Sequence, residues 1–127
     1  MKEAKDSLYP PDWIKKAQMD WNRMERMLED EDPEGASFFL QQSLEKYIKA
    51  FLLGKGWKLK KLHEIDSLLD DVVKYNQNLE PFRALCERVS GYYFTERYPG
   101  LGEEGLTCED VKKDIEEAKG FIEALLE

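Results

Sequence analysis

The sequence holds 27 acidic residues but a single histidine, His63, and this limits the metal and acid–base chemistry open to it. Di-metal sites in helical bundles use Glu-x-x-His pairs, but the residue three positions before His63 is Lys60. A zinc site needs several thiolate or imidazole ligands, and Cys86 and Cys108 lie far apart in the sequence. We therefore expect no metal and no cofactor, and both cysteines to be plain thiols.

His63 is also the one conventional base that could activate a serine or cysteine nucleophile, and nothing in the sequence places it beside one. It falls at the predicted start of a helix, where a capping or partly buried imidazole is the simpler interpretation. The functional alternative is a proton carrier or a phosphate ligand beside Lys60 and Lys61.

A lysine interrupts the most apolar stretch of the chain, residues 38–53. Lys46 shares a helical line with Phe39, Ser43 and Ala50, which packing would tend to bury. A charge in such a place needs a partner or a cleft. The pattern leaves two interpretations open, a structural ion pair and a side chain that faces a ligand.

Aromatic residues and an arginine gather at positions 92–99, which include Arg97 and Tyr98. Such a group can stack bases, anchor a protein partner or simply close one end of a bundle. The net charge of −8 disfavours general nucleic-acid binding, so packing or an interface is the preferred interpretation.

The elements that position these side chains are predicted to be helices. Apolar residues recur at helical spacing near 11–28, 33–53, 64–75, 80–98 and 108–125, and no segment alternates as a strand would. Short connections favour antiparallel neighbours. We expect one all-α domain over residues 1–127, with 1–10 as an N-terminal extension. It should form an up-and-down antiparallel bundle of four long helices plus one short helix.

The helix over residues 33–53 has two apolar faces, and one chain has to cover both or share one with a partner. This predicts a homodimer, with an interface on the second apolar line and the tyrosine-rich fourth helix: Phe39, Ser43, Lys46, Ala50 and Tyr93. No apolar run is long enough to span a membrane, and no signal sequence opens the chain, so a cytoplasmic protein is expected.

In its order of motifs the chain resembles the HEPN domain family. The resemblance rests on residues 39–50 (FLQQSLEKYIKA), on Leu-His-Glu-Ile at 62–65 before a Leu-Leu pair, and on Arg-Tyr-Pro at 97–99. It implies a helical bundle. Many members of the family are metal-independent ribonucleases with an Arg-x(4–6)-His motif, often acting as toxins. Arg88 fits the arginine, but positions 93–95 are Tyr, Phe and Thr, so the histidine is missing.

The resemblance therefore implies a non-catalytic module of the kind encoded beside a minimal nucleotidyltransferase. Such a module would dimerise and bind a nucleotide, the nucleotidyltransferase, or both, as in a toxin–antitoxin-like pair. Lys46, His63, Arg97 and Tyr98 are the expected ligand-binding residues. Two alternatives stay open. One is a divergent ribonuclease that uses His63 with Arg88 or Tyr93 and so binds RNA, and the other is a structural adaptor whose acidic C-terminal helix meets a basic protein.

Overall fold

The chain forms a bundle of α-helices in a computed structural model, which describes residues 7–58, 65–97 and 106–127, without the side chains of residue 66 and of 92–97. Five α-helices and one 3₁₀ helix make up this part, which contains no strand. Their bounds are α1 Pro10–Glu29, α2 Pro33–Gly54, α3 Ile65–Tyr75, η2 Gln77–Phe82, α4 Arg83–Arg97 and α5 Cys108–Leu126. The predicted all-α bundle, with α3 as its short helix, is confirmed.

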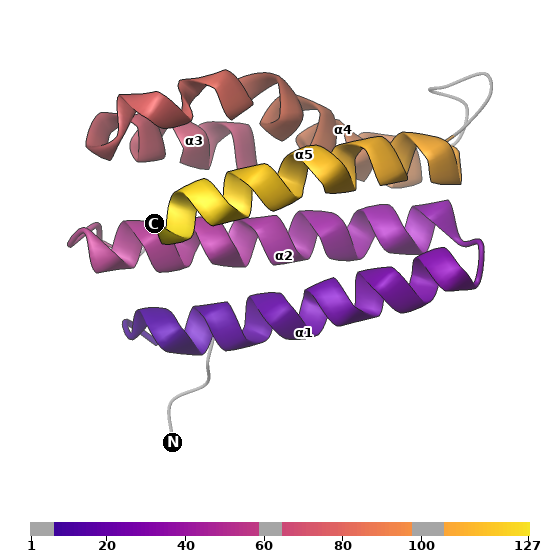
Figure 1. The fold of residues 1–127 in the computed structure, drawn as a ribbon, viewed down its shortest axis with the longest axis horizontal. Coiled ribbons are helices and arrows are strands. Elements are labelled where there is room, and N and C mark those ends of the chain that lie inside the picture. Colours follow the sequence, from indigo (N-terminus) through magenta and orange to yellow (C-terminus); the bar gives the residue numbers. More distant parts are fainter. Residues whose placement is uncertain (1–6, 59–64, 98–105) are drawn as a thin grey trace.

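α2 lies at the centre of the bundle (Figure 1). α1 packs along one side of it, and α3, α4 and α5 pack on the other. α1 and α4 run toward the same end of the molecule, and α2 and α5 run back (Figure 1). Both apolar faces of α2 are therefore covered within one chain, which explains why this helix is apolar nearly all round.

Local sequence signals set the ends of these helices. The carboxylate of Asp32 accepts the backbone N–H of Gly35 at 2.9 Å and caps α2, with Pro33 in its first turn. Gly56, at φ +87°, ends α2 in a Schellman turn, in which the N–H of Trp57 donates to the carbonyl of Leu52 at 3.0 Å. The spacing Thr107-x-x-Asp110 predicts a capping box, and the structure forms it reciprocally at the start of α5.

The start of the fourth helix differs from the prediction. The sequence Asn76-Gln77-Asn78 predicts a turn, and Glu80-Pro81 predicts the start of the helix, but η2 occupies 77–82 and α4 begins at Arg83. Asn76 accepts the backbone N–H of Asn78 at 3.0 Å, and this favours a tight local turn. Pro81 has no N–H to donate, so an α-helical hydrogen bond cannot form there.

The core contains large apolar side chains from α2 and from every helix around it. The fully buried ones include Met24 of α1, Leu44 of α2, Leu69 of α3, Leu85 of α4 and Phe121 of α5. The ring of Phe121 packs on that of Phe82, with 5.0 Å between centroids. Within the described part, no helix is both long and apolar enough to cross a membrane.

Tyr47 gives the core a measurable response to alkali. Its side chain is buried, and burial raises the pKa of its phenol above 10.0. Because the folded state then holds its proton more tightly than the unfolded state, stability is full below about pH 10 and falls as the pH rises through the folded pKa. We expect Tyr47→Phe to lose less stability than the wild type between about pH 9 and about pH 11, as measured by urea unfolding. Equal losses in both proteins would contradict this.

Candidate functional site

Charged side chains meet between α1 and α2, in a group that we call the seam cluster: Asp20, Arg23, Ser43 and Lys46. The ammonium of Lys46 donates to Asp20 Oδ2 at 2.5 Å, and Arg23 Nη1 donates to Asp20 Oδ1 at 2.8 Å. The hydroxyl of Ser43 donates to the carbonyl of Ala17 at 2.8 Å and so bonds α2 to α1. At the centre of the cluster, the buried carboxylate of Asp20 thus binds two cations.

The seam cluster exists because α1 turns a different face inward than its sequence pattern predicts. The apolar spacing of residues 11–28 predicts a buried stripe of Ile14, Ala17, Trp21, Met24 and Leu28. The structure buries Trp13, Ala17, Asp20 and Met24 instead, and leaves Ile14, Trp21 and Leu28 half-buried. Sequence reasoning missed Asp20. The one signal that could have found it was that Lys46, in the apolar helix, needed an acidic partner.

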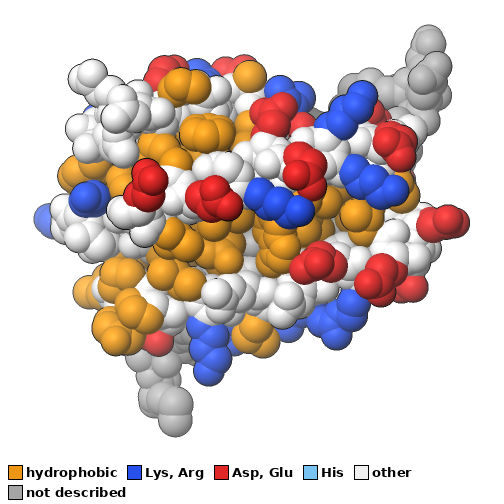
Figure 2. Space-filling view, in the orientation of Figure 1, with side chains coloured by type: hydrophobic (Ala, Val, Ile, Leu, Met, Phe, Trp, Pro, Cys, Tyr) orange, Lys and Arg blue, Asp and Glu red, His pale blue; other side chains and the backbone are white. Residues whose placement is uncertain are grey.

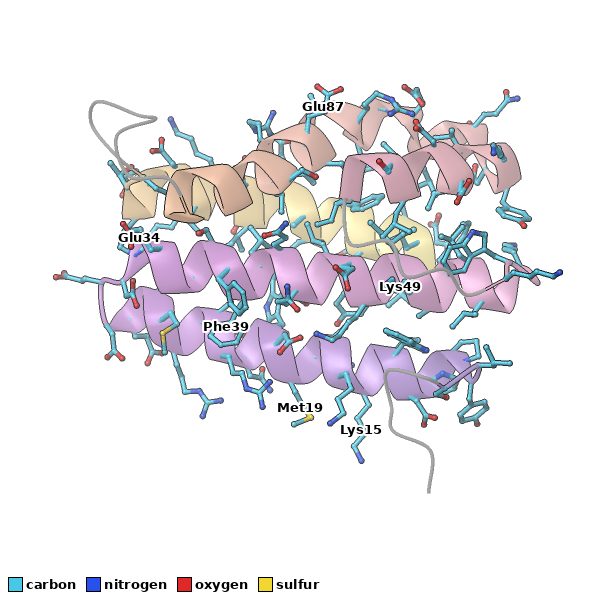
Figure 3. All side chains as sticks on the ribbon, turned by 180° about the vertical axis from the view of Figure 1, so that it is seen from behind. Lys15, Met19, Glu34, Phe39, Lys49 and Glu87 are labelled. Atoms are coloured by element: carbon cyan, nitrogen blue, oxygen red, sulfur yellow. The ribbon has the colours of Figure 1, made fainter. Side chains whose placement is uncertain are left out.

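A second ion pair lies one turn further along α2. Lys49 Nζ donates to Glu45 Oε2 at 3.2 Å, and both side chains are almost fully buried. The ammonium of Lys49, which is labelled in Figure 3, also lies 5.5 Å from the centre of the Trp13 ring. A buried ammonium with a carboxylate and an aromatic face beside it is well satisfied within the fold.

These contacts bear on the predicted dimer interface, which stays a prediction. Ser43 and Ala50 are buried under α1 of the same chain, so they are not accessible to a second copy in this conformation. Lys46 is bonded to Asp20, and the guanidinium of Arg23 lies 6.0 Å from the half-buried Phe39 ring. The second apolar face of α2 is a contact inside the monomer, because α1 supplies its cover. Lys46 keeps about a fifth of its side chain exposed, and its role toward a ligand stays a prediction.

Arg88 lies between α4 and α5 and binds two carboxylates. Its Nε donates to Asp114 Oδ1 at 3.0 Å, and its Nη2 lies 2.9 Å from Glu117 Oε2. Burial alone would lower the pKa of Arg88, but the hydrogen bonds to Asp114 and Glu117 outweigh it and raise that pKa. The guanidinium stays charged, and its charge is matched by two acids on α5.

This environment disfavours a phosphate at Arg88. The Arg88 side chain is 43% exposed, but a phosphate that approaches it would meet the negative charges of both Asp114 and Glu117. The sequence suggested Arg88 as a residue that could assist catalysis but did not indicate the two acids, which lie 26 and 29 positions further along the chain.

The remaining predicted site residues cannot be placed at the level of side chains. His63 and Tyr98 lie outside the described residues. Tyr93 and Arg97 belong to α4, but only their backbone is described. Over the described residues, no group of three or more metal-binding side chains comes together. Cys86 is buried, Cys108 is half-buried, and neither forms a disulfide.

This chain resembles a solved structure, and it matches the model of a protein family. Its fold is similar to the crystal structure of TT1696 from Thermus thermophilus, with a TM-score of 0.76 and 22% identity. That alignment covers 91% of this chain and 94% of the other. A search among curated proteins gives no significant match. The model of the HEPN domain matches residues 11–127, nearly the whole sequence. This chain therefore belongs to the HEPN domain family.

Proposed function

We propose that this chain is a non-catalytic HEPN module that works as a homodimer and binds a nucleotidyltransferase partner, a nucleotide, or both. The observation that carries the proposal is the state of Arg88. The arginine that would belong to an Arg-x(4–6)-His ribonuclease motif is paired with two carboxylates, and no histidine stands at positions 93–95. A role in a toxin–antitoxin-like pair would follow if the partner is such an enzyme.

The charges around Lys46, Lys49 and Arg88 favour the protein partner over the nucleotide. A triphosphate is held best by cations that are not already matched by acids. Lys46, Lys49 and Arg88 each form an ion pair within the chain. The net charge of −8 adds a general repulsion of anions. A nucleotidyltransferase surface with basic and apolar residues would meet no such barrier.

The proposal is tested by producing the chain together with the nucleotidyltransferase encoded by a neighbouring reading frame. We expect the two proteins to co-elute in size-exclusion chromatography, and more weakly at high salt if charges steer the contact. Titration of ATP by calorimetry tests the nucleotide part on the chain and on the complex. Separate elution at low salt, together with no heat at millimolar ATP, would overturn the binding function.

A ribonuclease assay tests the non-catalytic part. We expect labelled RNA to remain intact with the wild type, with Arg88→Ala and with His63→Ala alike. Cleavage by the wild type that is lost in either variant would show an enzyme and overturn the proposal. Cleavage that persists in both variants would point to a contaminating nuclease. The three proteins would then be compared again after a further purification step.

A further inference from the structure

An apolar groove runs between α1 and α5 on the face shown in Figure 2. Hydrophobic side chains follow it, with acidic and basic side chains on both sides. The groove includes an open hollow of about 270 Å³. Its lining is apolar in the middle and charged at the edges: Trp21, Met24, Glu25, Leu28, Lys112, Ile115, Glu116 and Lys119.

The fold leaves this groove open because α1 packs on α2 rather than on α5. α1 and α5 both lie against α2, and few contacts join them directly. The groove side of α1 carries Ile14, Trp21 and Leu28, which the sequence pattern predicted to be buried and which are only partly covered. On α5, Ile122 is half-buried and Leu126 is 49% exposed. The apolar face that the monomer leaves incompletely covered is therefore here, and not on α2.

The charges at the edges of the groove complement each other under a two-fold axis. An isologous dimer places the same patch of each chain against itself, so the patch must carry its own opposite charge. α1 contributes Glu25, and α5 contributes Lys112 and Lys119. Lys119 is already paired with Glu116 at 3.0 Å, but Lys112 is only loosely paired, 3.8 Å from Glu109. A two-fold axis along the groove, parallel to α1 and α5, would bring Glu25 of each copy toward Lys112 of the other.

The groove is also large enough for a specific interface. α5 has 19 residues, which at ~1.5 Å per residue gives ~28 Å of length, and α1 is similar. Two helices side by side are roughly 20 Å across, so the face measures roughly 560 Å² per copy and ~1,100 Å² in total. Specific, stable interfaces bury about 1,200–2,000 Å² in total, and about 1,000 Å² is the threshold for a biological interface, so burial of this whole face reaches the low end of the range.

We propose that the α1–α5 groove is the dimer interface and that a second copy of this chain occupies it. The two pairs of helices would pack across the axis as a four-helix layer, with Trp21 and its apolar neighbours at the centre and the Glu25–Lys112 contacts at the edges. This rests on the homodimer of the proposed function and gives that dimer a surface other than the line on α2.

Sedimentation equilibrium with a charge swap tests this interface. The wild type should have a mass of twice 14.9 kDa at micromolar concentration. Glu25→Lys and Lys112→Glu should each weaken self-association about tenfold, and the double variant should recover to within about threefold of the wild type. Met19→Glu is the control, because Met19 is exposed and points away from the rest of the bundle (Figure 3), and it should not change the mass.

Three results would overturn this interface. One is a monomer at every concentration, and another is a dimer that ignores the charge swap. The third is a groove variant that stays dimeric but no longer binds the nucleotidyltransferase, since the groove would then belong to that partner. Co-elution with the nucleotidyltransferase is measured on the same variants. If wild type and Glu25→Lys both still bind it, a failure of the dimer leaves the binding function standing.

Discussion

Glu45→Ala is expected to lower the free energy of unfolding by about 3–5 kcal/mol. The change removes the carboxylate 3.2 Å from the ammonium of Lys49, a side chain that is only 4% exposed. The Trp13 ring beside it attracts a cation but cannot replace a counter-charge. The buried lysine must then lose its proton or draw water into the bundle, and either response costs free energy.

Urea unfolding followed by circular dichroism measures this loss, with Glu87→Ala as the matched control. Glu87 is exposed on α4 (Figure 3), so the same substitution there should change stability by no more than about 0.5 kcal/mol. A second variant separates charge from packing. Glu45→Leu with Lys49→Met removes both charges and keeps apolar volume, and it should recover most of the stability. A loss below about 1 kcal/mol in Glu45→Ala would show that the pair is solvated in solution.

Leu44→Ala is expected to cost about 2–5 kcal/mol, because it leaves a cavity in the centre of the bundle. Leu44 is fully buried on α2, the helix that contacts α1, α3, α4 and α5. Since α2 contacts α3, α4 and α5, no single neighbouring helix can move in to fill the space without leaving another.

The same unfolding experiment has two controls, one with the same change at another position and one with a different change at position 44. Leu8→Ala deletes the same atoms from a side chain that is 63% exposed and should cost no more than about 0.5 kcal/mol. Leu44→Met keeps the volume and should cost less than about 1.5 kcal/mol. Equal midpoints for Leu44→Ala and Leu8→Ala would mean that the core around α2 is not close-packed.

The helices could be predicted because their signals are local. Apolar spacing, Pro33 at the start of α2, Gly56 after its end and the Thr107–Asp110 box each act within a few residues, and all are present in the fold. The fourth helix starts later than expected because Asn76 favours a tight local turn and Pro81 has no N–H to donate, and the buried Leu79 lies between them.

The site was harder to predict because its contacts join residues far apart in the chain. The sequence showed that Lys46 needs a partner, but not that Asp20 provides it from α1, 26 positions away. It placed Arg88 in the fourth helix, but not between Asp114 and Glu117. The rotation of α1 decides which of its residues meet α2, and a helix of mixed pattern offers more than one rotation of similar burial.

The sequence by itself determined that this chain is an all-α bundle of the HEPN family and that no histidine follows Arg88 at positions 93–95, since both follow from residue types at fixed positions. Only the tertiary structure decided where the charges are matched and which apolar face is left open. α1 covers the second face of α2 and thereby exposes a groove against α5. The physical reason is that helix formation is settled within a few turns, whereas burial and charge pairing depend on which helices come to lie side by side.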